Sequence, residues 1–157
     1  YLSDPEQIQL MPGAVEGLRG LQALGLGLIV VTNQSGIGRR YFSVECLNSV
    51  NSRLSQILAD EGVRLAGVFF CPHLPEDGCE CRKPASGLVE KAARILDFVP
   101  DESFVFGDRE SDIGLAKAIG ATSFLVRSPN ARQSDFHQDY TIMDLTEAVP
   151  IVSGILD

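Results

Sequence analysis

The chain has 157 residues, 45% of them hydrophobic and 22% charged, and a formal net charge of −8 at neutral pH. This length and composition are typical of one globular domain with a substantial core, and the negative charge argues against broad electrostatic binding to nucleic acid or anionic membranes. The apolar runs are too short to span a bilayer, and the start of the chain has no signal-peptide pattern. We therefore expect a cytoplasmic protein that works as a monomer on a small molecule.

The chain alternates between helical and strand-like patterns. Apolar residues at a spacing of three or four predict helices at 14–24, 43–61, 88–96 and 113–119, and a last helix from Thr146. Apolar runs predict strands at 26–31, 65–71, 103–106 and 122–126, with an edge strand at 142–145. Repeated strand, loop and helix units indicate an α/β fold with a doubly wound, mainly parallel sheet. The apolar run at 26–31 is typical of a strand covered on both faces.

The loop after the second predicted strand has the spacing of a metal site. Three cysteines and a histidine fall within eleven positions, which suits one tetrahedral Zn²⁺ with all four positions filled by protein. A disulfide is disfavoured because one intervening residue strains a bridge between the last two cysteines, and a bridge to the first would leave one thiol unpaired. Scattered thiols without a metal are the other alternative. The candidate zinc ligands are Cys71, His73, Cys79 and Cys81.

The end of the first predicted strand carries a polar loop, 32–38. In open α/β sheets, ligands bind at the carboxyl ends of the strands, so this loop is a candidate site by its position. The Thr32 hydroxyl and the backbone amides that follow could hold a phosphoryl oxygen. The alternative is a simple turn with a helix cap.

Asp108 and Asp112 follow the third predicted strand and are four positions apart. Two oxygen donors at a strand tip suit Mg²⁺, which binds few carboxylates and keeps water and phosphate oxygens as its other ligands. Capping of the next helix by acidic residues is the alternative. If these loops meet at one sheet edge, Thr32, Lys83 and Asp108 form a site for phosphoryl transfer, in which charge stabilisation supplies most of the catalysis.

These residues together resemble a known superfamily. The segments 32–36, 71–84 and 107–112 are similar in order and spacing to the second, third and fourth motifs of the haloacid dehalogenase (HAD) superfamily. More narrowly, they resemble its zinc-containing branch, the heptose 1,7-bisphosphate phosphatases and histidinol-phosphate phosphatases. The similarity extends over about residues 1–127, and a zinc loop that ends in Arg82-Lys83-Pro84 is rare elsewhere in the superfamily.

The resemblance implies a role for each matching residue. Thr32 would hydrogen-bond the transferring phosphoryl group and Lys83 would neutralise it, while Asp108 would ligate Mg²⁺ with Asp112 in support. The family fold is a Rossmann-like sheet without a large cap domain, so loops near the site would select the substrate. The substrate-contacting set would be Thr32, Asn33, Gln34, Ser35, Arg82, Lys83 and Arg109.

The sequence departs from the family at one point. The family's nucleophile lies in an Asp-x-Asp-Gly-Thr motif after the first strand, and no Asp-x-Asp occurs in this sequence. Tyr1 to Gly13 resembles the segment shortly after that motif, and no methionine opens the chain. We therefore expect residues 1–157 to be a single HAD-like domain that lacks its first strand and nucleophile motif.

The predicted activity is that of a magnesium-dependent phosphomonoesterase that forms an aspartyl-phosphate. The segment 32–39 favours removal of the 7-phosphate from D-glycero-D-manno-heptose 1,7-bisphosphate, whereas Leu74-Pro75 and Gly107 to Arg109 are reminiscent of histidinol phosphatases. A third hypothesis, from another class, is a zinc-stabilised phosphate-binding domain without a nucleophile.

Overall fold

The computed structural model describes residues 1–127 and 135–157. The helices are α1 (Ala14–Ala23), α2 (Ser35–Gly38), α3 (Val44–Asp60), α4 (Gly87–Leu96), α5 (Glu110–Ile119) and α6 (Ala148–Leu156). The strands are β1 (Leu28–Asn33), β2 (Leu65–Cys71), β3 (Phe104–Gly107), β4 (Thr122–Val126) and β5 (Tyr140–Ile142). Four short 3₁₀ turns are η1 (Pro5–Gln7), η2 (Pro75–Asp77), η3 (Pro100–Glu102) and η4 (Leu145–Glu147).

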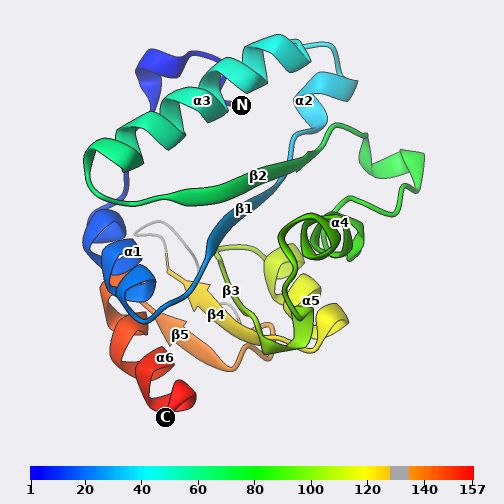
Figure 1. The fold of residues 1–157 in the computed structure, drawn as a ribbon. Helices are drawn as coiled ribbons and strands as arrows, with labels where there is room; N and C mark the ends of the chain where they lie inside the picture. The colour runs from blue at the N-terminus through cyan, green and yellow to red at the C-terminus, as the bar shows by residue number, and fades with distance from the viewer. Residues whose placement is uncertain (128–134) are drawn as a thin grey trace.

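The strands run parallel, with helices packed around them (Figure 1). This confirms the predicted α/β class with parallel sheets. The strands form two groups, β1–β2 and β3–β4–β5, and no hydrogen-bonded pairing joins β1 to β3 within the part of the chain that the structure describes. Each of these two strands therefore has one unpaired edge.

The unpaired edges change the burial of the two strands. We expected full burial of the apolar run at 26–31, but every residue of β1 remains partly exposed, and so does every residue of β3. That expectation is wrong for this structure. The pattern of apolar residues along a strand predicts which of its faces are covered. The exposed fraction of its residues also depends on whether another strand lies beside its edge.

The main apolar cluster lies under β3, β4 and β5. Phe124 has no exposed surface and stacks between Phe106 and Tyr140, with ring centroids 4.6 and 5.0 Å away. Helix α1 packs on α6 and η4, where a side chain at Gly17 or Gly20 would collide with Leu145 or Val149 respectively. Burial of these aromatic and aliphatic side chains is the largest stabilising contribution to this half of the molecule. The buried members of the cluster are Leu21, Phe124, Ile142, Ala148 and Val152.

Several element boundaries differ from the sequence prediction. Strand β1 covers Leu28–Asn33 instead of 26–31, so Thr32 and Asn33 belong to the strand. Helix α5 begins at Glu110, three residues before the predicted start, because the Asp112 carboxylate accepts the backbone N–H of Arg109 and caps the first turn. The edge strand lies at Tyr140–Ile142 instead of 142–145, and α6 begins at Ala148 after a 3₁₀ turn. Asp144 starts that turn by accepting hydrogen bonds from the Thr146 hydroxyl and backbone N–H.

None of the described helices is both long and apolar enough to cross a membrane.

Candidate active site

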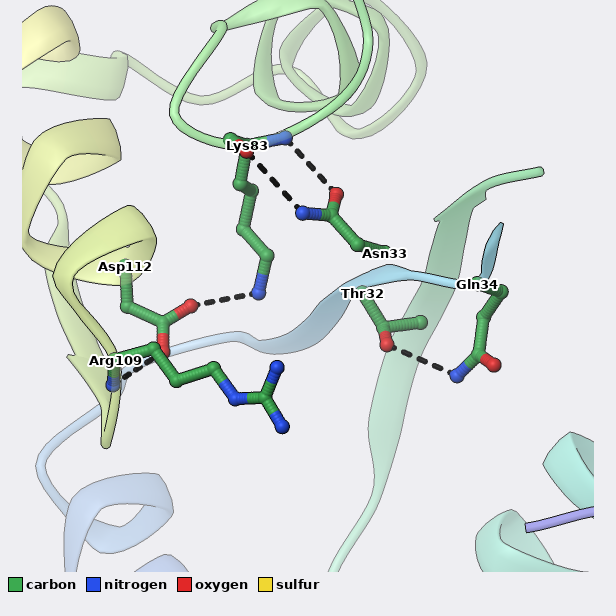
Figure 2. A network of polar contacts seen from close by, with 6 residues as sticks. All are labelled: Thr32, Asn33, Gln34, Lys83, Arg109 and Asp112. Atoms are coloured by element: carbon green, nitrogen blue, oxygen red, sulfur yellow. Dashed lines mark hydrogen bonds and ion pairs between the residues drawn. The ribbon is translucent and has the colours of Figure 1, made fainter. Parts of the chain in front are cut away.

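The predicted site residues line one cavity of about 670 Å³ at the carboxyl ends of β1 and β3. All nine residues predicted for catalysis, substrate contact or magnesium border this cavity. Figure 2 shows the side chains of Thr32, Lys83 and Arg109 pointing toward a common space. The expected convergence of the strand-end loops is therefore confirmed. The nine residues are Thr32, Asn33, Gln34, Ser35, Arg82, Lys83, Asp108, Arg109 and Asp112.

The end of β1 orients a hydroxyl toward this space. Gln34 Nε2 donates a hydrogen bond to Thr32 Oγ1 over 3.1 Å. Since this bond uses Thr32 Oγ1 as an acceptor, the hydroxyl hydrogen remains free to be donated to a ligand oxygen. The backbone N–H of Gln34 donates to the carbonyl of Cys71, 2.7 Å away, which ties the turn to the end of β2.

Lys83 lies on a loop and is held from two sides. Its ammonium Nζ lies 2.7 Å from Asp112 Oδ1, and both side chains are largely buried, with 14% and 10% of their surface exposed. Its backbone N–H donates to Asn33 Oδ1 over 2.9 Å, and its carbonyl accepts from Asn33 Nδ2 over 3.2 Å. Both ends of the lysine are therefore fixed before any ligand binds (Figure 2).

The two aspartates have different surroundings. Asp112 uses Oδ1 for Lys83, and its Oδ2 accepts the backbone N–H of Arg109 over 3.2 Å. Asp108 is exposed at the cavity wall. Asp108 is thus the more available oxygen donor for a cation, while Asp112 links the lysine to the first turn of α5. The predicted helix-capping alternative holds for Asp112 and coexists with its contact to Lys83.

The cavity also carries guanidinium groups in excess of its carboxylates. Arg39, Arg82 and Arg109 line it, and none of them forms an ion pair with a described carboxylate. One terminal nitrogen of Arg82, Nη1, is buried without a hydrogen-bond partner in the described structure. A buried guanidinium nitrogen loses several hydrogen bonds to water, so a bound anion would compensate for its burial.

The phenol of Tyr1 lies beside these cations. Its hydroxyl is 2.8 Å from Ser35 Oγ. This hydrogen bond is the main cause of a lowered pKa of Tyr1, and Arg39 and Arg82 lower it further. The hydroxyl and the two guanidinium groups form a polar, positively charged part of the cavity on a protein that is acidic overall.

The four predicted zinc ligands form one cluster. Their ligand atoms all lie within 4.8 Å of one another. Cys71 Sγ is 3.5 Å from Cys79 Sγ and 2.9 Å from Cys81 Sγ, and Cys79 Sγ is 3.7 Å from Cys81 Sγ. Tetrahedral zinc with Zn–S bonds of about 2.3 Å separates its sulfurs by about 3.7 Å, so three thiols and an imidazole gathered here could hold zinc once the Cys71 and Cys81 sulfurs move apart. The cysteines form no disulfide.

The thiols also show why a cation would be favourable here. Burial, together with hydrogen bonds to Cys71 and Cys79, raises the pKa of Cys81 to about 12. Burial alone would also raise the pKa of Cys79, but the backbone N–H of Arg82 and the neighbouring thiols lower it to about 7. Without a metal, the negative charges of adjacent thiolates repel one another. A divalent cation bound between them would neutralise this repulsion.

Some residues of the cavity were missed in the predicted site set. Arg39 was not included, and neither was Ser111, although both line the cavity. Gly107 matters for a steric reason: a Cβ at this position would collide with the Asp112 carboxylate. The glycine directly before Asp108 was the available signal, but its contact with Asp112 depends on how β3 turns into α5.

Comparisons with known proteins agree with this arrangement. The HAD-hydrolase-like family matches residues 80–148. The D-glycero-β-D-manno-heptose-1,7-bisphosphate 7-phosphatase of Pasteurella multocida (strain Pm70) is 32% identical to this chain, over 99% of the chain and 89% of the relative. The Helicobacter pylori (strain ATCC 700392 / 26695) protein of the same name is 36% identical, over 82% of the chain and 76% of the relative.

A solved structure shares both fold and sequence with the chain. It is the D,D-heptose 1,7-bisphosphate phosphatase of B. bronchiseptica, complexed with magnesium and phosphate. It superposes with a TM-score of 0.87 at 27% identity, and the match covers 99% of this chain and 89% of that structure. This chain belongs to the HAD-like hydrolases and, among them, to the family of D-glycero-D-manno-heptose-1,7-bisphosphate 7-phosphatases.

Proposed function

We propose that this protein is a magnesium-dependent phosphatase that removes the 7-phosphate of D-glycero-D-manno-heptose 1,7-bisphosphate. The observation that carries the proposal is the meeting of Thr32, Lys83 and Asp108 at one cavity. The relatives named for this reaction support it, and so does the magnesium and phosphate bound by the B. bronchiseptica enzyme.

In this proposal two side chains bind the transferring phosphoryl group. The Thr32 hydroxyl, with its oxygen engaged by Gln34, donates to a phosphoryl oxygen. The Lys83 ammonium neutralises the negative charge that the phosphoryl oxygens carry in the transition state, and its bond to Asp112 keeps it in place beforehand. Preorganised donors of this kind need no rearrangement when the charge develops.

Asp108 is the proposed direct magnesium ligand. Its exposed carboxylate at the cavity wall is the kind of hard oxygen donor that Mg²⁺ prefers. Asp112 supports the site from the first turn of α5, since both of its oxygens are already hydrogen-bonded. When bound, magnesium would add positive charge beside the phosphoryl oxygens.

The nucleophile has to come from an aspartate that this sequence does not contain in the family's Asp-x-Asp form. We propose that a strand carrying that motif pairs between β1 and β3, so that residues 1–157 form the rest of a single domain. The unpaired edges of both strands and their incomplete burial support this placement. The first aspartate would attack phosphorus to form an aspartyl-phosphate, and the second would protonate the leaving sugar oxygen and then take a proton from the attacking water.

The charge of the cavity favours a bisphosphate over histidinol phosphate. When one phosphate is bound at Lys83, the guanidinium groups of Arg39, Arg82 and Arg109 still line the cavity. None of them forms an ion pair with a carboxylate among the described residues. A second phosphate would complement them, with the buried Nη1 of Arg82 as one donor. Histidinol phosphate instead carries an amine and an imidazole at its far end, which would be repelled by guanidinium groups.

Phosphate release from three substrates tests this assignment. Full-length natural protein is assayed with Mg²⁺ on heptose 1,7-bisphosphate, heptose 7-phosphate and histidinol phosphate. We expect the highest kcat/KM with the bisphosphate and a loss of that advantage over the 7-phosphate in Arg39→Ala. Arg53→Ala, on the exposed surface of α3, is the control. Activity on histidinol phosphate alone would overturn the substrate, and no phosphate release from any of the three would favour a non-catalytic phosphate-binding domain.

We also propose that the protein is a cytoplasmic monomer. None of the four cysteines forms a disulfide, which is typical of a reducing compartment. Sedimentation of the full-length protein would test the oligomeric state, and a stable dimer would contradict it.

A further inference from the structure

We propose that Asn33 is a positioning residue, whose carboxamide fixes the backbone of Lys83 so that the ammonium is held where the reacting phosphoryl group binds. This inference rests on the proposed function and assigns the Asn33 side chain a role different from the substrate contact expected from the sequence.

The backbones of the three proposed catalytic residues, Thr32, Lys83 and Asp108, are fixed to different degrees. Thr32 lies within β1 and Asp108 directly follows β3, so hydrogen-bonded strands fix their backbones. Lys83 instead lies on the irregular segment between β2 and α4. A flexible backbone at this point would spread the ammonium over several positions, and a displacement of about 1 Å in a catalytic group can cost about 100-fold in rate.

Asn33 satisfies both backbone polar groups of Lys83. The backbone N–H of Lys83 donates to Oδ1 over 2.9 Å, and the Lys83 carbonyl accepts from Nδ2 over 3.2 Å. The carboxamide thus does for Lys83 what a neighbouring strand does for a residue in a sheet. Figure 2 shows this pair of bonds joining the end of β1 to a loop fifty residues later in the chain.

The ammonium end of Lys83 is fixed independently of Asn33. The ammonium binds Asp112 over 2.7 Å, and Asp112 in turn accepts the backbone N–H of Arg109. Asn33 sets the position of the Lys83 backbone, while Asp112 sets that of its ammonium. Together these contacts connect the loops after β1, β2 and β3, so each loop of the site restrains the next.

A double-mutant cycle tests this role, with heptose 1,7-bisphosphate as substrate and full-length protein. We expect Asn33→Ala to lower kcat by about 10- to 100-fold while KM changes by less than about 3-fold. In a Lys83→Ala background the same substitution should change kcat by less than about 2-fold, because its effect passes through the lysine. Asn48→Ala, on the exposed face of α3, is the matched control.

The opposite results would overturn the inference. If Asn33 contacts substrate directly, the fold-loss in kcat of the double variant will equal the product of the losses of the two single variants. Alternatively, Asn33→Ala will change KM and leave kcat unchanged. Asn33→Ser, whose side chain is too short to reach both backbone groups, replaces the alanine variant if the latter does not fold, with the same expected result. If Lys83→Ala turns over too slowly to measure, the cycle is run on the Kd of inorganic phosphate in the presence of Mg²⁺.

The two proposals can fail separately. Absence of phosphate release from the wild-type protein would refute the proposed function, and the phosphate-binding cycle would still test the coupling of Asn33 to Lys83. Phosphate release by the wild type together with independent effects of the two residues would refute only the positioning role.

Discussion

The two halves of the sheet hold their functional residues by different means. In the β3–β5 half, an apolar cluster around Phe124 packs beneath the strands, and a tight turn from β3 into α5 places Asp108 and Asp112. In the β1–β2 half, Lys83 comes from an irregular loop between β2 and α4. Polar contacts and the Cys71, His73, Cys79 and Cys81 cluster hold that loop.

This difference separates overall stability from the placement of catalytic groups. Removing apolar volume from the β3–β5 half should weaken the whole domain, because hydrophobic burial dominates folding free energy. Removing a polar anchor from the β1–β2 half should disturb the site while leaving most of the core packed. The predictions below test this division, beginning with the largest expected effect.

Phe124→Ala should lower the free energy of unfolding by about 3–5 kcal/mol, because it removes a fully buried ring that stacks on two other aromatic rings. Urea titration measures the loss, and activity per folded molecule should change little. Leu156→Ala is the control, since Leu156 is 49% exposed. A loss of activity without a loss of stability would contradict the division between the two halves.

Lys83→Ala should lower kcat by about 10²- to 10³-fold, the usual effect of removing one donor that stabilises transition-state charge. Stability should also fall, by about 1–3 kcal/mol, because Asp112 would be left largely buried without its partner. Phosphate release and circular dichroism measure the two effects. Lys91→Ala, on the exposed face of α4, should leave both unchanged. Near wild-type turnover in Lys83→Ala would show that Lys83 does not contribute to catalysis.

Cys79→Ser should release the metal and lower activity by about 10-fold while the core of the other half remains folded. The physical reason is that the cluster orders the segment leading directly to Arg82 and Lys83. Elemental analysis counts the zinc. Cys46→Ser is a close control because Cys46 lies outside the cluster, with its thiol against the carbonyl of Ser3. Unchanged zinc content in Cys79→Ser would refute the ligand set.

Asp144→Asn should give the smallest effect, and the effect should depend on pH. Hydrogen bonds from the Thr146 hydroxyl and then from the Thr146 backbone N–H lower the pKa of Asp144. A carboxyl with a lowered folded-state pKa stabilises the fold above its unfolded pKa of about 3.9, and this contribution is lost as pH falls through the folded value. Urea midpoints of wild type and variant should therefore differ slightly at pH 7 and converge in acid. A constant difference at every pH would show that the charge is not responsible.

The sequence predicted which residues line the cavity better than it predicted the contacts that hold them. The motifs at 32–36, 71–84 and 107–112 sufficed to name nine of the residues that line the cavity and the four members of the Cys/His cluster, because each motif is local in the chain. The partners of those residues come from elsewhere. Asn33 meets Lys83 across fifty positions, and Arg39, which is absent from the predicted substrate-contacting set, reaches the cavity only through the turn of α2.

By itself, the sequence determined the α/β class, the parallel strands and the soft-ligand cluster, since periodicity and ligand spacing are properties of short segments. Tertiary structure alone decided that Asp112 binds Lys83 while Asp108 stays open to the cavity. It also decided that β1 and β3 each have an edge to which no strand of the described residues pairs. The reason is physical: the partner of a charge and the neighbour of a strand depend on which distant segments fold side by side, and periodicity along the chain does not encode that.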